Sequence, residues 1–250
     1  MKDGWPEGYG RRVLAEVDST NAEAARIAPT LAGPEWILAL RQTAARGRRG
    51  RVWQNPEGNF AATLVMRPEG APGQVALRSF VASLALYDAV VAVTGRGDGL
   101  TLKWPNDVLL NGGKLAGILL ESMGSGGAVT HLVIGIGVNL AEAPEMAEVE
   151  ADALRPVSLL SESGVAITPE DFLELLAGAY ARIEAQFQSF GFAPVRAAWL
   201  DRAAKLGEVI TARTSRETVT GVFETVDEHG NLVLLSGKKR HAIPAADVFF

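Results

Sequence analysis

The chain of 250 residues contains no cysteine and only three histidines, His131, His229 and His241. Without cysteine it has no disulfide scaffold, no thiolate metal site and no thiol nucleophile. The histidines are scattered and lack the spacing of metal ligands. No apolar run approaches about 18 residues, the length that spans a bilayer, and the first residues lack an apolar signal core. These absences predict a soluble cytoplasmic protein with no membrane partner.

The composition is that of an ordinary globular protein. Hydrophobic residues make up 48% of the chain and charged residues 21%. A chain of this length can bury a full core, which fits one large domain plus a small one. The formal net charge of -5 argues against a general nucleic-acid binder, so we expect no DNA partner.

Familiar enzyme motifs are missing or incomplete. The sequence has no Gly-x-Ser-x-Gly elbow and no Walker A loop. Residues 45–50, Ala-x-Gly-x-x-Gly after a strand-like segment, resemble a dinucleotide-binding fingerprint. That fingerprint must open a helix, whereas Asn55, Pro56 and Gly58 follow this one. A dehydrogenase is therefore not favoured.

Apolar patterning predicts an α+β domain over residues 1–204. Strands are expected near residues 13–17, 36–40, 60–66, 100–104, 108–110, 115–121 and 131–140. Helices are expected at residues 20–29, 74–93, 168–187 and around Trp199. Thr20 and Glu23 indicate a capping box at the first of these helices. An acidic stretch is expected to be a solvated loop, with Glu142, Glu145, Glu148, Glu150 and Asp152.

The pattern changes after Lys205. Short strands separated by turn residues are expected at residues 208–212, 218–223, 232–235 and 240–243. They predict a small β domain over residues 205–250. Because a domain of this size is near the lower limit for independent stability, we expect it to pack against the main body.

Residues 41–51, here called the arginine loop, carry five arginines, two glycines and no acidic residue. Glycine lets a backbone approach a ligand closely, and arginine offers a rigid fork of donors to phosphate or carboxylate. A charge run of this length is also typical of a solvated face or a nucleic-acid patch. The apolar segment 36–40 before it and Trp53 in the turn after it favour a loop that closes over a small anionic ligand.

A second informative block runs from Lys103 to Glu121. Asn111-Gly112-Gly113 between two apolar segments indicates a β-hairpin, and Lys114 lies at its mouth. A lysine there is either a solvated strand end or a cation that a rigid element points at a phosphate. Farther along, Gly135 and Gly137 thin a strand, which suits either a flat ligand on the backbone or a packed helix.

Together these blocks resemble the biotin–protein ligases. That family has a loop of the form Gly-Arg-Gly-Arg-x-Gly-Arg followed shortly by Trp, and residues 45–53 read Ala-Arg-Gly-Arg-Arg-Gly-Arg-Val-Trp. The family's second block, Lys-Trp-Pro-Asn-Asp and then Lys-Leu-Ala-Gly-Ile-Leu, is present at residues 103–107 and 114–119. Ser19-Thr20-Asn21, Gln42 and residues 135–139 fall in the expected order. The resemblance spans residues 13–140, and the C-terminal β domain is similar in position and size.

The resemblance implies a fold and a division of the chain. The fold is a mixed β-sheet with packed helices, the class II synthetase-like biotin and lipoyl ligase domain, followed by a small SH3-like β-barrel. Residues 1–204 are then the biotin- and ATP-binding catalytic domain, and residues 205–250 the C-terminal domain. Two departures stand out: Ala45 replaces the first loop glycine, and no helix-turn-helix segment precedes Val13. We expect the type without a DNA-binding domain.

The implied reaction is ATP-dependent. Biotin is activated as biotinyl-5′-AMP with release of pyrophosphate, and a lysine of a biotin carboxyl carrier protein or domain then accepts the biotin. Catalysis is assigned to Lys114 and Arg48. Biotin binding is assigned to Ser19, Thr20, Asn21, Gln42, Arg46, Gly47, Arg48, Lys114 and Gly117. ATP or adenylate binding is assigned to Arg46, Arg48, Arg49, Gly50, Arg51, Trp53, Asn106, Asp107 and Asn139. Mg²⁺ is expected on the phosphates with Asp107, and a homodimer is a further expectation.

Two other functions compete with this one. A lipoate–protein ligase shares the fold and the reaction type, but it resembles the arginine loop and the Lys-Trp-Pro-Asn-Asp block less. A non-enzymatic biotin sensor or regulator is the alternative outside the enzymes.

Overall fold

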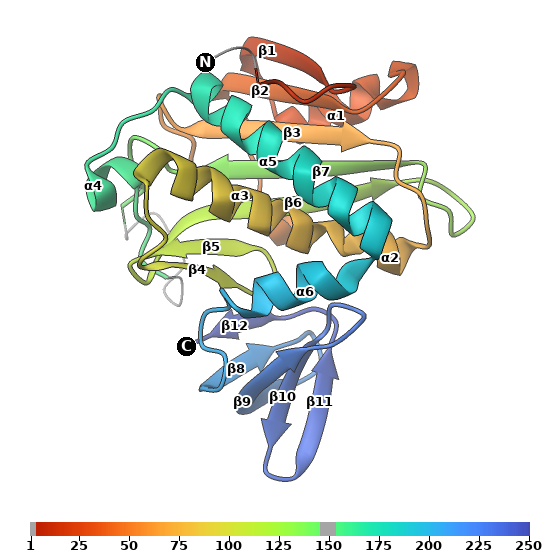
Figure 1. Cartoon of the computed structure of the whole chain (residues 1–250), viewed down its shortest axis with the longest axis vertical. Coiled ribbons are helices and arrows are strands. Elements are labelled where there is room, and N and C mark those ends of the chain that lie inside the picture. Colours follow the sequence, from red (N-terminus) through yellow and green to blue (C-terminus); the bar gives the residue numbers. More distant parts are fainter. Residues whose placement is uncertain (1–3, 146–153) are drawn as a thin grey trace.

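The computed structural model describes residues 4–145 and 154–250, and two β-sheets organise them (Figure 1). The larger sheet has the strand order β1-β2-β3-β7-β6-β5-β4. Its strands are β1 (Gly10–Val17), β2 (Glu35–Gln42), β3 (Phe60–Met66), β4 (Leu100–Lys103), β5 (Asp107–Leu110), β6 (Gly113–Met123) and β7 (His131–Val138). β1 pairs with β2 in parallel and the other neighbours are antiparallel. The predicted mixed sheet is confirmed.

One face of this sheet is covered by α3 (Arg78–Thr94) and α5 (Pro169–Phe190), which cross it side by side (Figure 1). The single helix predicted over residues 74–93 is wrong in detail. The chain forms α2 (Pro72–Ala76), breaks at Leu77 and then begins α3. Gly95 ends α3 in a left-handed conformation, with φ of 72°. α4 (Leu159–Ser163) was not predicted, and α6 (Phe192–Leu200) is the helix expected around Trp199.

Within the described residues, Pro72–Thr94 is the one helical stretch long and apolar enough to cross a bilayer. However, 67% of its most apolar window is buried inside the protein. Trp36, Leu86 and Tyr180 join β2, α3 and α5 in one core, where all three side chains are fully buried. The apolar character of the stretch is therefore that of a core helix.

The opposite face of the sheet carries α1 (Thr20–Ile27). Ala24 of this helix packs on Ile37, Val65 and Val133. Side chains alternate between the two faces of a strand, and these three lie on the face opposite to α3 and α5. The predicted capping box is wrong: Ser19 is the N-cap residue and makes no side-chain cap hydrogen bond. Among the described residues, α1 is the helix that covers this face near β2, β3 and β7.

Residues after Lys205 form a second, five-stranded antiparallel sheet with the order β11-β10-β9-β8-β12. Its strands are β8 (Val209–Arg213), β9 (Thr218–Val226), β10 (Leu232–Ser236), β11 (Lys239–Ile243) and β12 (Asp247–Phe249). The SH3-like β domain is confirmed, although β12 was not predicted. The indole nitrogen of Trp104 donates to the carbonyl of Gly230 at 3.0 Å, and the two sheets share one apolar cluster. The small sheet thus packs against the main body, as its size requires.

Of the predicted acidic loop, Glu142 and Glu145 are described; both lie outside helices and strands and both are exposed, as predicted. Glu148, Glu150 and Asp152 lie outside the described residues.

Candidate functional site

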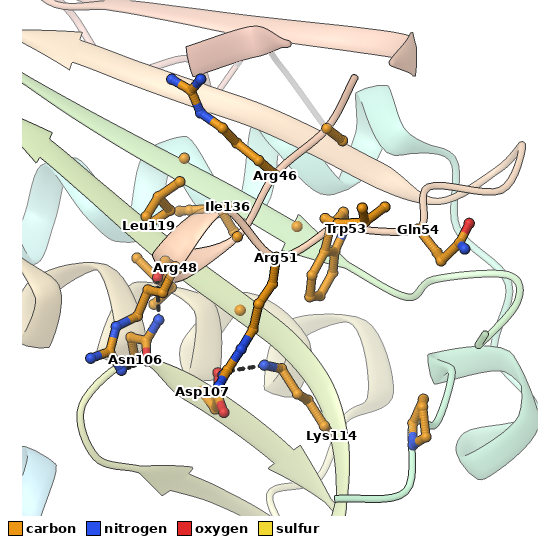
Figure 2. Close-up of a pocket in the computed structure, with 18 of the residues that line it drawn as sticks. Arg46, Arg48, Arg51, Trp53, Gln54, Asn106, Asp107, Lys114, Leu119 and Ile136 are labelled. Carbon is orange, nitrogen blue, oxygen red and sulfur yellow. Dashed lines mark hydrogen bonds and ion pairs between the residues drawn. The ribbon is translucent and has the colours of Figure 1, made fainter. Parts of the chain in front are cut away.

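A cavity of about 400 Å³ lies on the sheet face that carries α1 (Figure 2). Its walls come from the start of α1, the arginine loop, the hairpin of β5 and β6, strand β7 and strand β12. The predicted site residues in these walls are Ser19, Thr20, Asn21, Gln42, Arg46, Gly47, Arg48, Arg51, Trp53, Asn106, Asp107, Lys114, Gly117 and Asn139. Segments far apart in the sequence therefore meet at one cavity. Arg49 and Gly50 do not line it, and their binding roles stay predictions.

The arginine loop turns sharply in the middle. Arg48–Gly50 form a short 3₁₀ turn, closed by a hydrogen bond from the Gly47 amide to the Arg51 carbonyl at 2.7 Å. Arg49 and Gly50 have φ of 57° and 75°, in the left-handed region that costs a non-glycine residue energy. This turn leaves Arg48 in the cavity wall and Arg49 outside it.

The indole of Trp53 lies flat against the strand backbone beneath it. Gly117 of β6 and Gly137 of β7 are paired across the ladder. A Cβ built at Gly137 would meet the Trp53 ring at 2.6 Å, and one at Gly117 would meet it at 3.3 Å. The glycines therefore do admit a flat group, but in this structure it is the protein's own tryptophan. Helices α3 and α5 do not explain Gly117 and Gly137, because these helices cover the opposite face, whereas Gly135 packs against Asn21 of α1, as the helix-packing alternative predicts.

A polar wall stands at the other end of the cavity. The amide oxygen of Gln42 accepts from the Thr20 backbone at 2.8 Å and from its hydroxyl at 3.2 Å, which leaves the Gln42 amide nitrogen as the group to donate to a ligand. The Thr63 hydroxyl lies 2.8 Å from the Thr20 hydroxyl and 2.7 Å from the Asn21 amide oxygen. Asn21 also fills the space over Gly135, where a Cβ would meet its Oδ1 at 2.2 Å. The wall is thus held rigidly by side chains that are themselves buried.

Lys114 extends from the start of β6 into the cavity beside Trp53 and Asp107 (Figure 2). The predicted hairpin is confirmed: Asn111 and Gly112 join β5 to β6 with φ of 50° and 76°, the double left-handed turn that Asn-Gly favours. Nζ of Lys114 lies 2.8 Å from Oδ1 of Asp107 and 5.7 Å from the centre of the Trp53 ring. The hairpin therefore fixes a cation within the wall, which favours the phosphate-directed interpretation over a solvated strand end.

Cations gather around Lys114 at the same wall. A guanidinium nitrogen of Arg48 lies 3.3 Å from the Asn106 amide oxygen. Burial lowers the pKa of Arg48 and of Lys103. The negative charge of Asp107 raises both pKa values, but burial has the larger effect. Partly desolvated cations interact strongly with an anion that enters the same cavity. The wall is suited to binding phosphate or carboxylate.

Asn139 has a structural role besides the binding role predicted for it, which stays a prediction. Its side chain is 3% exposed and donates to the carbonyl of Val157 at 3.0 Å, while its backbone amide donates to Leu115. It lines the cavity, and its side chain also holds the chain after β7 in place.

Several residues of the site were not assigned from the sequence. Lys103 lies within the Lys-Trp-Pro-Asn-Asp motif without a separate assignment, and the sequence around Thr63 is that of an ordinary strand. Glu121 accepts from the Asn21 amide at 2.7 Å and pairs with Arg46 at 3.3 Å, so it links the polar wall to the arginine loop. Residues 246–249, which include β12, line the cavity from the small sheet. The alternation of β6 could have placed Glu121 on the face of Gly117, but no sequence signal brings β12 to this cavity.

The same residues offer few ligands to a metal ion. Among the residues that the structure describes, no group of three or more His, Cys, Asp or Glu side chains is placed to hold an ion. Asp107 and Asn106 supply oxygen atoms in the wall. Mg²⁺ commonly binds through one or two carboxylates together with substrate phosphates and water. The residues fit an ion that phosphates bring with them, and they do not form a complete cage.

Comparison with known proteins agrees with this geometry. The profile of the "Biotin/lipoate A/B protein ligase family" matches residues 13–139, and that of the "Biotin protein ligase C terminal domain" matches residues 205–250. A biotin--[acetyl-CoA-carboxylase] ligase of Paracoccus denitrificans is 57% identical over 238 residues, which are 95% of this chain and 99% of that protein. The chain belongs to the biotin protein ligase family. This membership favours a biotin ligase over a lipoate ligase or a non-enzymatic sensor.

More distant biotin ligases are similar over most of the chain. A biotin--[acetyl-CoA-carboxylase] ligase of Mycobacterium tuberculosis is 33% identical over 94% of this chain and 87% of that protein. The bifunctional ligase/repressor BirA of Bacillus subtilis is 29% identical, and the match spans 65% of its length. The structure of the Aquifex aeolicus biotin protein ligase with biotin and ATP has a TM-score of 0.80 at 25% identity, over 96% of this chain and 97% of that one.

Proposed function

We propose that this biotin protein ligase activates biotin with ATP and transfers it to a lysine of a biotin carboxyl carrier domain. In the first step the biotin carboxylate attacks the α-phosphorus of ATP, which forms biotinyl-5′-AMP and releases pyrophosphate. In the second step the acceptor amine attacks the carbonyl of this mixed anhydride, which forms an amide and releases AMP. The observation that supports this best is one cavity with a rigid polar wall, a flat tryptophan and a cluster of cations.

The first step joins two anions, so cations are needed where charge develops. We assign this role to Lys114, because the hairpin holds its ammonium group at the cavity wall beside Trp53. Arg48 is assigned to the same phosphates, and burial strengthens its interaction with them. Arg46 and Arg51 line the cavity from the same loop, and Gly47 lets that loop's backbone approach the intermediate.

The polar wall fits the head group of biotin. A buried urea group has both donors and acceptors, and each needs a partner. Ser19, Thr20, Asn21 and Gln42 are buried or partly buried and supply them. Gly117 lines the cavity beside Trp53 and Lys114 and is assigned to the biotin side chain. Trp53 and Asn139 are assigned to the adenylate side.

Mg²⁺ would be held by the phosphates of ATP, with Asp107 and Asn106 as the protein's oxygen donors. When bound, it would neutralise charge on the leaving pyrophosphate. Asp107 then has two partners available, the ion and Lys114.

We extend the proposal to the division of the chain at residue 205, a homodimer and a cytoplasmic location. Proteolysis, sedimentation and fractionation test these in turn.

The proposed function is tested by transfer to a carrier domain. The purified protein is incubated with biotin, Mg²⁺, ATP and a biotin carboxyl carrier domain, and the mass of the carrier is measured. We expect the mass of one biotinyl group, added at a single lysine. A carrier in which that lysine is replaced by arginine serves as the control. Persistent absence of the added mass, with biotin and ATP both bound, would reject the function.

A further inference from the structure

Strand β12 of the small sheet reaches the arginine loop of the large one. Asp247 begins this strand, and its carboxylate forms an ion pair with Arg49 and a second contact with Arg51 at 3.3 Å. The neighbouring carbonyl of Ala246 lies 3.4 Å from a guanidinium nitrogen of Arg48. Three arginines of the loop, Arg48, Arg49 and Arg51, are thus in contact with two consecutive residues of the C-terminal domain.

The position of Asp247 is fixed by its own strand. β12 pairs with β8, with Asp247 opposite Arg213 and Val248 opposite Ala212. Val248 and Ala212 are buried in the core, so alternation along the strand turns Asp247 to the other side, toward the loop. The Asp247 side chain is 15% exposed, compared with 49% for Arg49. The carboxylate is therefore the more buried partner, and Arg49 and Arg51 are the more exposed ones.

Arg49 has no place in the cavity, yet the loop adopts a left-handed φ of 57° at this residue. Such a conformation persists when surrounding contacts hold it. The ion pair with Asp247 is such a contact, and it holds the residue directly after Arg48, which lines the cavity. Holding Arg49 outside therefore keeps Arg48 directed inward.

We propose that Asp247 is a positioning residue that anchors the arginine loop in its closed form and retains the acyl-adenylate. Retention matters because an acyl-adenylate is hydrolysed when water reaches it. The inference rests on the proposed function for its consequence, but the anchoring itself requires no substrate. The C-terminal domain would then act in the first half of the reaction through Arg49 and Arg51, without touching the reacting atoms.

The anchoring is tested first without ligand, because the loop is rich in trypsin sites. The rate of tryptic cleavage within residues 46–51 is measured by mass spectrometry for the wild type, Asp247→Asn and Asp247→Glu. Glu224→Gln is the matched control, since it removes a carboxylate that pairs with Arg240 on the same sheet, away from the cavity. We expect cleavage about three- to tenfold faster in Asp247→Asn, the range for one partly buried ion pair, with partial recovery in Asp247→Glu. Equal rates in Asp247→Asn and the wild type would overturn the proposal.

The consequence is tested by the rate at which preformed biotinyl-AMP leaves the protein. We expect release about three- to tenfold faster in Asp247→Asn, while biotin-dependent ATP–pyrophosphate exchange changes less than threefold. In a protein that already carries both Arg49→Gln and Arg51→Gln, adding Asp247→Asn should change the rate of biotinyl-AMP release little further. Slower release in Asp247→Asn would overturn the proposal, because the carboxylate would then restrain the loop from closing. Faster tryptic cleavage in a protein that shows no exchange at all would reject the proposed function and leave the anchor supported.

Discussion

The ammonium group of Lys114 lies 2.8 Å from the carboxylate of Asp107, across the hairpin that joins β5 to β6. About a third of the Lys114 side chain is exposed, at 32%, and it faces the cavity. A pair this accessible to solvent contributes little to folding. Its consequence is placement: Asp107 holds the amine at the position where an incoming phosphate would meet it.

Replacing this lysine should therefore affect catalysis more than stability. We expect Lys114→Ala to lower ATP–pyrophosphate exchange by about 10²–10³-fold, the usual loss when one group that stabilises transition-state charge is removed. Biotin affinity, measured by calorimetry, should change little because the polar wall remains. Lys238→Ala, at an exposed turn, is the control. Normal exchange in Lys114→Ala would remove this residue from the mechanism.

The arginine loop is expected to retain the intermediate as well as to help form it. Arg48→Gly removes the contacts with Asn106 and Ala246 and adds backbone freedom. We expect labelling of non-cognate lysines, such as those of serum albumin, to rise by about ten- to a hundredfold as biotinyl-AMP escapes. Arg41→Ala, which removes an exposed pair with Glu16, should leave labelling unchanged. Unchanged acceptor selectivity in Arg48→Gly would count against the role of the loop.

The position of the Trp53 ring can be tested by a substitution at Gly137, which lies under it. In Gly137→Ala the new methyl group would lie 2.6 Å from the indole, so the ring must move. We expect the KM for ATP to rise about tenfold, the equivalent of roughly 1.4 kcal/mol, with little change in biotin affinity. Gly73→Ala introduces a methyl group with no atom within 4 Å and is the control. An unaltered KM for ATP would place the adenylate elsewhere.

The lowered pKa of Lys103 predicts that the KM for ATP depends on pH. Burial holds its pKa below the ordinary 10.5. The residue is charged below its lowered pKa, so its contribution to ATP binding is present at lower pH and lost as pH rises through that value. We expect the KM for ATP to increase at alkaline pH in the wild type, and to increase less in Lys103→Arg, which stays charged. Identical profiles for the two proteins would show that Lys103 does not bind the nucleotide.

Much of the fold could be predicted because local sequence determines it. The turn at Asn111 and Gly112 and the Pro169 start of α5 were found from residue type alone. The break at Leu77 carries neither Gly nor Pro, and the three residues of β12 are too short for a periodic signal. Both elements depend on tertiary packing that the sequence pattern does not contain.

The site divides in the same way. Residues within a continuous motif, such as Arg48 and Lys114, could be found because their spacing carries the chemistry. Glu121, Thr63 and Asp247 act through partners 42 or more positions away, and only the folded sheet brings them together. At the start of α1 the local prediction was wrong, since Thr20 was expected to be the capping residue, whereas Ser19 is the N-cap and Thr20 is the first helical residue.

The central claim is that this cavity activates biotin with ATP. Its most direct test is biotin-dependent ATP–pyrophosphate exchange by the purified protein with Mg²⁺, with lipoate as the control acid. We predict exchange with biotin and none with lipoate. Exchange with lipoate alone would move the activity to the lipoate ligases, and tight biotin binding without any exchange would contradict the proposed chemistry.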